Sequence, residues 1–210
     1  MAAGFPVKAD YATGDVLSAA NMNDLSATLN YIDPTGETNG FVLTRNSSAS
    51  GGLEWAAAAG GGTTYAVFTD QKTSGTHGGT FTSGAFRTRD INTSQFNNIS
   101  GASISSNQIT LGAGTYQINA SCPATDVNQN ITRLYNITDS SVTVLGSSEY
   151  NDQAGFTDVT RSFIQGIFTI AGTKVFEIQH QGSITKSTTG FGVATGISTE
   201  TYTIVNITKI

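Results

Sequence analysis

The chain has 210 residues, of which 38% are hydrophobic and only 12% are charged, and its formal net charge is −5. Gly, Thr, Ser and Asn together occupy 92 positions, and this composition argues against a mainly helical protein. The 11 Phe and 7 Tyr residues supply enough apolar surface for a core, which argues against a disordered chain. Ten basic residues against 15 acidic ones, with no basic stretch, argue against nucleic-acid binding.

Cysteine content and hydrophobic runs narrow the class of protein further. The single cysteine, Cys122, cannot form an internal disulfide and rules out a zinc site made of several thiolates. No apolar run approaches the ~18 residues of a membrane-spanning helix, and residues 1–10 lack the pattern of a secretory signal. We therefore expect a protein that does not insert into a membrane and is not exported by the general route.

Residues 14–33 predict a short helix, which begins near Asp15 or Ser18 and ends at Asp33 before Pro34. An isolated helix of this length is marginal in water, so its apolar side needs a partner surface. That surface belongs either to the chain's own domain or to another protein to which residues 1–35 anchor the chain. The apolar seam consists of Met22, Leu25, Leu29 and Ile32.

Residues 36–62 predict a small β-hairpin followed by a flexible joint. A β-run at 41–43 and a second at 53–55 flank a Ser- and Gly-rich turn, and four alanines and three glycines follow. Trp55, the only tryptophan, fits packing within the hairpin better than ligand stacking. We interpret the segment as a short stalk.

Residues 63–210 alternate between short strands and turns and show no helical period. This pattern predicts an antiparallel sandwich or jelly roll of ten strands. The predicted strands are 64–70, 86–91, 107–112, 114–121, 130–137, 141–149, 160–170, 174–181, 190–197 and 200–210.

Several predicted strands carry apolar side chains on both faces, whereas a half-exposed antiparallel strand has one polar face. Ile204 and Val205 point to opposite sides of the last strand, and Ile167 and Phe168 do the same in 160–170. A single sandwich cannot cover both faces, so we expect a homo-oligomer. We assign to its subunit interface Phe163, Ile167, Phe176, Tyr202 and Ile204.

Sequence signatures of catalysis are missing, and we predict no enzymatic activity, cofactor or metal site. The segment from Asp126 imitates a calcium loop but has Ile131 at the glycine position and Ile137 at the position of the bidentate Glu. One acidic cluster leaves a single bound ion or a glycan-hydrolysing tip open as weaker alternatives. It consists of Glu149, Asp152 and Asp158.

The polar segment 71–85 is long for a loop in a compact domain, and such loops on a β-scaffold commonly carry recognition. A structural crossover between two strands is an equally good interpretation. With ten strands alternating in direction, loops 71–85, 138–140 and 171–173 lie at one end, opposite the stalk. The candidate receptor contacts are Lys72, His77, Phe81 and Asp139, with Arg87 as a further polar candidate.

The order of the strands resembles the trimeric jelly roll of tumour necrosis factor and of the globular heads of complement. The resemblance is carried by GTYQINAS (114–121), TRLYNIT (132–138), GIFTIAGTKVFEIQH (166–180) and TYTIVNITKI (201–210). Residues 65–93 resemble the form found in bacteriophage fibre and tail proteins. GDVLSAANMNDL (14–25) and GFVLTRNSSASGGLEWAAA (40–58) are similar to an N-terminal segment and a stalk unit of phage structural proteins.

This resemblance implies a homotrimeric, non-enzymatic virion protein, with residues 1–35 bound to other virion proteins, 36–62 as stalk and 63–210 as a jelly-roll head. The head would contact a receptor or glycan on the host surface. The collagen-like repeat of the complement proteins and a long fibre shaft are missing from the sequence. A capsid decoration or head-fibre protein that coats or stabilises the particle is therefore the alternative.

Overall fold

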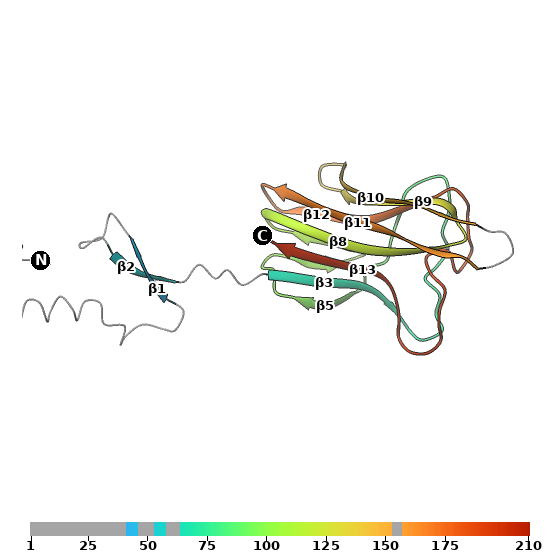
Figure 1. The fold of residues 1–210 in the computed structure, drawn as a ribbon, viewed down its shortest axis with the longest axis horizontal. Coiled ribbons are helices and arrows are strands. Elements are labelled where there is room, and N and C mark those ends of the chain that lie inside the picture. Colours follow the sequence, from blue (N-terminus) through green and yellow to red (C-terminus); the bar gives the residue numbers. More distant parts are fainter. Residues whose placement is uncertain (1–40, 46–52, 58–63, 153–156) are drawn as a thin grey trace, which may run out of the picture. The chain divides into compact units, whose positions relative to one another are not determined.

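The computed structural model of the chain describes residues 41–45, 53–57, 64–152 and 157–210 (Figure 1). Residues 1–62 and 63–210 form two separate units. The predicted helix at 14–33 and its seam of Met22, Leu25, Leu29 and Ile32 lie outside the described residues.

The described part of the first unit is a two-stranded hairpin. Strand β1 (Phe41–Arg45) pairs antiparallel with β2 (Leu53–Ala57), and Leu43 lies opposite Trp55. This pairing confirms the hairpin that the sequence predicted for the segment.

The second unit, which we call the head, contains eleven strands in its described residues. They are β3 (Thr64–Lys72), β4 (Arg87–Thr88), β5 (Thr93–Asn97), β6 (Ser103–Ser105), β7 (Gln108–Leu111), β8 (Gly114–Thr125), β9 (Asn128–Asn136), β10 (Ser141–Asn151), β11 (Val159–Ile170), β12 (Lys174–Gly182) and β13 (Glu200–Lys209).

Two antiparallel sheets make up the head. The five-stranded sheet has the order β11-β8-β13-β3-β5, and Figure 1 shows these strands in succession. The other sheet has the order β10-β9-β12-β7-β6, and β4 pairs with β12. The mainly β, two-layer antiparallel architecture predicted from the sequence is therefore confirmed.

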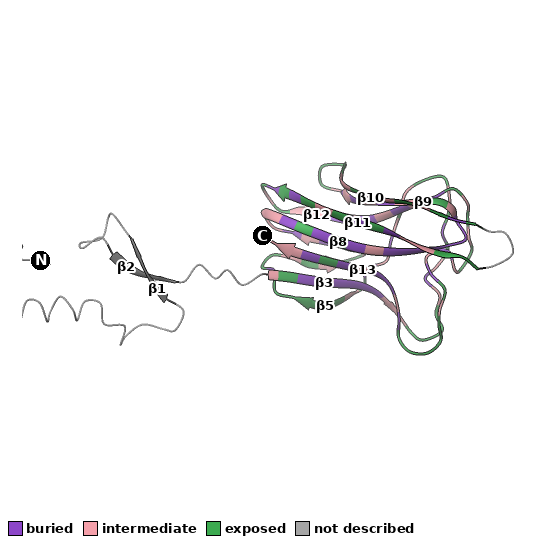
Figure 2. Cartoon of the chain, in the orientation of Figure 1, coloured by how far each residue is buried: buried purple, intermediate pink, exposed green. Residues whose placement is uncertain are grey.

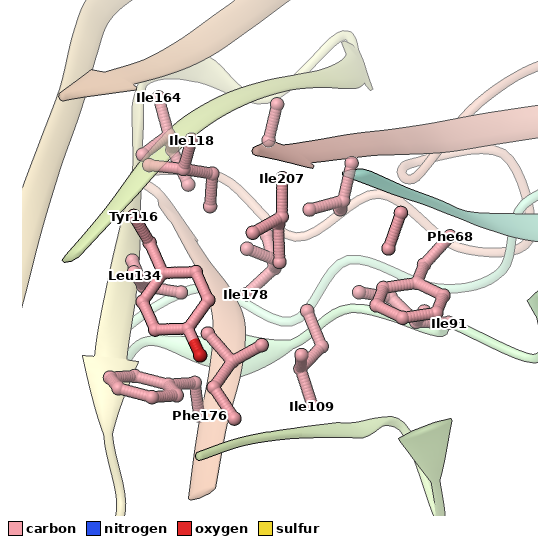
Figure 3. Close-up of a cluster of buried hydrophobic side chains, with 14 of the residues drawn as sticks. Phe68, Ile91, Ile109, Tyr116, Ile118, Leu134, Ile164, Phe176, Ile178 and Ile207 are labelled. Atoms are coloured by element: carbon pink, nitrogen blue, oxygen red, sulfur yellow. The ribbon is translucent and has the colours of Figure 1, made fainter. Parts of the chain in front are cut away.

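The core lies between the two sheets (Figures 2 and 3). Side chains of a strand point alternately to its two faces, so every second one points into this core. On β8, Tyr116 and Ile118 are buried while Gln117 and Asn119 are exposed. Such alternation gives β8 one polar and one apolar face. The largest buried apolar side chains of the core are Phe68, Ile91, Ile109, Leu111, Tyr116, Ile118, Leu134, Ile164, Phe176 and Ile178.

Three strand assignments made from the sequence are wrong: β5 and β6 were missed, and 190–197 is not a strand. Strand β6 was missed because it has three residues, two of them serine, and is held in place by a tight turn to β7. Ser106 and Asn107 both have positive φ, at 51° and 65°, as a two-residue type I′ hairpin turn requires. Conversely, 190–197 is not a strand, because Gly192 and Gly196 have positive φ and the segment folds back on the head.

The missed strand β6 and the false strand at 190–197 together invert the direction of every predicted strand between 107 and 181. Loops 138–140 and 171–173 consequently lie at the end where β3 begins and β13 ends, not at the end of loop 71–85. Figure 1 shows the C-terminus at that same end, beside the start of β3. Asp139 is therefore separated from Lys72 and His77 by the length of the sandwich.

Two side chains assigned to the subunit interface belong to the interior of a single chain. Phe176 is fully buried in the core between the sheets. Tyr202 is 4% exposed, because a bulge between Thr201 and Ile204 breaks the two-residue period of β13. The Tyr202 hydroxyl donates a hydrogen bond to the carbonyl of Thr76 at 2.7 Å.

Candidate functional site

The end of the head where β3 ends is built from two long segments, 73–86 and 183–199, which we call the tip. The segments pair through backbone hydrogen bonds, including Gly78 N to Gly192 O at 2.9 Å and Phe81 N to Lys186 O at 2.9 Å. Gly192 lies against the ring of Tyr202, where an added Cβ would come within 2.2 Å of a ring carbon. The tip is thus a packed structure with fixed backbone paths.

Arg89 is the largest fully buried side chain of the head, and it ties the tip to both sheets. Its guanidinium donates from Nη1 to the Pro123 carbonyl at 2.7 Å and from Nη2 to the Phe191 carbonyl at 3.0 Å. Nε donates to Thr203 Oγ1 at 2.9 Å. The guanidinium also lies 4.5 Å from the centre of the Phe191 ring. A buried cation that is satisfied by neutral acceptors fixes the position of each of them.

His180 continues this buried network. Its Nδ1 lies 3.2 Å from Arg89 Nη1, which is a donor, so Nδ1 accepts and the proton sits on Nε2. Nε2 in turn donates to Asn130 Oδ1 at 2.9 Å. Burial, reinforced by the charge of Arg89, holds the pKa of His180 well below its ordinary value. The imidazole is therefore a neutral structural group.

Phe81, predicted as a receptor contact, is fully buried, and that prediction is wrong. Its ring packs edge-on against His180 at 5.0 Å and against Phe191 at 4.7 Å. With Ala124 and Val127 it forms a small second core beneath the tip.

The other predicted receptor contacts make bonds within the head. Lys72 Nζ bonds to Asp90 at 2.7 Å and to Asp70 at 3.2 Å, and its side chain is only 17% exposed. His77 Nδ1 accepts a hydrogen bond from the Ala194 backbone at 2.9 Å.

Two further polar candidates are also engaged. Arg87 donates to the carbonyls of Thr82 and Ser83, and Asp139 pairs with Lys174 at the far end of the sandwich from the tip. These side chains hold loops in place.

The exposed surface of the tip comes instead from residues that the sequence did not single out. Ile197 is 88% exposed and Val193 is 36% exposed, among Thr and Ser side chains of both segments. The Glu200 carboxylate accepts backbone hydrogen bonds from Thr195, Gly196 and Gly75, which lower its pKa to about 2. Because 190–197 was predicted to be a strand, these residues were not expected to form an exposed loop.

The outer face of the five-stranded sheet is apolar at both edges. On β11, Phe163 and Ile167 are 42% and 65% exposed. At the other edge Tyr65 stacks on Phe96 with ring centres 4.5 Å apart, and both are more than 40% exposed. Ile204, on β13 between these edges, is half-buried. The predicted interface residues Phe163, Ile167 and Ile204 thus lie on one face.

Cross-strand register arranges this face in three rows. The first row is Phe163, Ser121 and Ile204; the second is Gln165, Asn119, Asn206, Val67 and Phe96; the third is Ile167, Gln117, Thr208 and Tyr65. Arg161 of β11 lies beside the first row and donates from Nη1 to Ser121 Oγ at 3.0 Å.

On the outer face of the other sheet, the guanidinium of Arg133 lies against two aromatic rings. Arg133 lies 3.7 Å from the centre of the Phe86 ring and 4.5 Å from that of Tyr135, and its Nε donates to Gln179 at 2.9 Å. This cluster fixes segment 73–86 to β9 and β12.

The weaker chemical alternatives gain no support from the described residues. The Glu149 carboxylate accepts from Ser147, and Asp158 accepts from the backbone of Asp152. No group of three or more His, Cys, Asp or Glu able to hold a metal ion occurs in the described part of the chain.

Within the described residues, no helix has the length and apolar character needed to cross a membrane. The lone thiol, Cys122, is buried, and burial raises its pKa to about 11.

No protein-family model and no curated protein matches the sequence. Among solved structures, the chain is similar to murine APRIL at pH 5.0, with a TM-score of 0.47 and 6% identity over 70% of this chain and 99% of that one. The globular domain of zebrafish complement 1qA protein gives a TM-score of 0.42 and 12% identity over 70% and 96%. Likenesses at this level support no conclusion about binding or assembly, and the fold assignment rests on the two sheets themselves.

Replacing Arg89 by methionine is expected to lower the free energy of unfolding by at least about 3 kcal/mol, because each buried acceptor left without a donor costs about 1–3 kcal/mol. Urea denaturation measures this loss. Arg87→Met is the matched control, since Arg87 is exposed, and it should change stability by less than about 0.5 kcal/mol. Equal losses in the two variants would contradict the role assigned to Arg89.

Stability should fall below pH 6.5 because of His180. The unfolded chain binds a proton at this imidazole near its ordinary pKa of 6.5, whereas the folded chain does not. The free energy of unfolding therefore decreases as the pH falls from 6.5 towards the lowered pKa, by up to about 1.4 kcal/mol per pH unit. Urea denaturation from pH 7.5 to 5 should show a shallower slope for His180→Gln. An unchanged slope would exclude this histidine as the cause.

Proposed function

We propose that the chain is a non-enzymatic structural protein of a bacteriophage particle, a homotrimeric short fibre or spike whose head attaches to the host surface. The observation that carries this proposal is the outer face of the five-stranded sheet, which has exposed apolar side chains at both edges. Such a face is typical of a surface covered by another copy of the chain.

The rows of this face suit a closed ring of copies. When copies are related by rotation about an axis along the strands, one edge of each copy meets the other edge of the next at the same height. Ile167 and Tyr65 occupy the two ends of one row. The β11 edge of one copy can therefore pack Ile167 against Tyr65 of the next copy, where Tyr65 is stacked on Phe96. Three copies is the number implied by the resemblance to trimeric jelly rolls.

The direction of the chain through the head supports a spike with the tip outward. The head begins at one end of the sandwich, at Thr64, and the tip lies at the other end. A stalk that joins at Thr64 leaves the tip available for contact, with the apolar side chains of Val193 and Ile197 set among hydroxyl groups. Affinity per head would be modest, and several copies would gain avidity from their high effective concentration.

The assignment to a phage particle rests on the N-terminal sequence. Residues 14–25 and 40–58 resemble an N-terminal segment and a stalk unit of phage structural proteins. On this proposal, residues 1–35 bind other virion proteins and the head is exposed on the particle. The alternative is a capsid decoration or head-fibre protein whose main task is to coat or stabilise the particle.

Self-association can be tested by introducing a charged side chain at the proposed interface. The purified protein should scatter light as three chains at micromolar concentration, and Ile167→Lys should convert it to a monomer because three lysines would be buried without partners. Leu145→Lys is the matched control, since Leu145 is 58% exposed on β10 and lies outside the interface. A monomeric wild-type protein would exclude the ring.

Attachment is tested by competition for the host surface. The trimeric protein at micromolar concentration is expected to slow phage adsorption, and Ile197→Asp on the tip should weaken this inhibition at least tenfold. Val142→Asp, on exposed β10, serves as the control. If the wild-type protein neither binds cells nor slows adsorption, attachment is refuted, and labelling of the protein on intact particles tests the decoration alternative.

A further inference from the structure

Three carboxamide side chains form one row across the centre of the outer face of the five-stranded sheet. Gln165 on β11 pairs in register with Asn119 on β8, and Asn119 pairs with Asn206 on β13. All three are exposed. We call these three residues the amide row, and Gln117 extends it by one position into the next row.

The amide row is unpaired within the head. Within the described residues, none of its three side chains hydrogen-bonds to another protein group, and neither does Gln117. Several other amides of the head hold backbone and loops: Asn151 bonds to Val127 N and Ala124 O, and Asn136 bonds to Asp139. The amide row therefore has no role in the fold of one chain that its contacts reveal.

Apolar side chains flank the two ends of the amide row on the same face, whereas Ser121 and Gln117 flank its centre. Phe163 and Ile204 lie in the row on one side, and Ile167 and Tyr65 lie in the row on the other. Any partner that covers these apolar groups also removes the amides from water. A carboxamide that loses water without gaining a new partner keeps its full desolvation cost.

We propose that the amide row fixes the register and the number of copies in the self-assembled head. A carboxamide is both donor and acceptor, so the central amides of copies whose faces meet around the axis satisfy one another when they lie at the same height. A slip by one row, about 6.8 Å along an antiparallel strand, would set Gln165 at the height of Phe163 or Ile167 and, in one direction, Asn206 at the height of Ile204. A single buried Asn specifies register and oligomeric state in coiled coils in the same manner.

This inference rests on the proposed self-association, and a second copy is the occupant that fits the whole face. A glycan or a polar peptide could also bond to carboxamides, but it would leave the apolar edges uncovered. Only a copy of the same face offers amides at the centre together with apolar groups at matching heights on both sides.

Two substitutions of the full-length protein separate register from affinity. Asn119→Leu replaces the central amide with an apolar side chain of similar volume. This variant should still associate, but native mass spectrometry should resolve several oligomeric states in place of the single state of the wild type. Asn119→Asp keeps the shape and adds a charge to each copy. It should raise the concentration for half-dissociation at pH 7 at least tenfold.

Gln181→Glu supplies the control for the added charge. It makes the same amide-to-carboxylate change on β12 in the opposite sheet, at a side chain with no hydrogen-bond partner among the described residues, and should leave the half-dissociation concentration within twofold. A wild-type monomer would overturn self-association and the amide row together. A wild-type trimer with Asn119→Leu equally uniform, or with Asn119→Asp equally tight, would overturn the amide row alone.

Discussion

The buried guanidinium of Arg89 is the interaction on which the head depends. An arginine excluded from water must place its N–H groups on acceptors, and here they lie on three separate parts of the chain: β8 at Pro123, the bulge of β13 at Thr203, and the tip at Phe191. The carbonyl of Phe191 is thereby held over the end of the sandwich, and Phe81 fills the space beneath. The hydrogen bonds that the buried Arg89 side chain must make therefore help to fix the backbone path of the tip.

The two ends and the two outer faces of the head have different roles. The head begins at the end where Thr64 lies, the opposite end carries the tip, and the outer face of the five-stranded sheet has exposed apolar side chains at both edges. On the other sheet, Arg133 and its two aromatic neighbours form contacts that are complete within one chain. Among the described residues, the outer face of the five-stranded sheet combines unpaired amides at its centre with exposed apolar side chains at both edges.

Alternation of apolar and polar residues predicted most of the long strands, because a two-residue period is a local property of the sequence. It failed where the period is broken or very short. The bulge in β13 turns Tyr202 inward, three residues suffice for β6, and Gly192 breaks an apparent strand at 190–197. The partners of Arg89 could not be predicted, since they come from positions up to 114 residues away. Of the predicted interface residues, Phe163 and Ile167 lie together on one exposed face, whereas Phe176 is in the core.

Cys122 gives the head a chemical property of practical value. Its thiol is the only one in the sequence, lies in the core next to the Arg89 network, and has a pKa of about 11. Alkylating reagents attack the thiolate, so they reach this cysteine only when the sandwich opens. The rate at which Cys122 is alkylated therefore measures how often the fold opens. A second cysteine placed on the surface can be labelled with a dye or cross-linker while the native one stays in place.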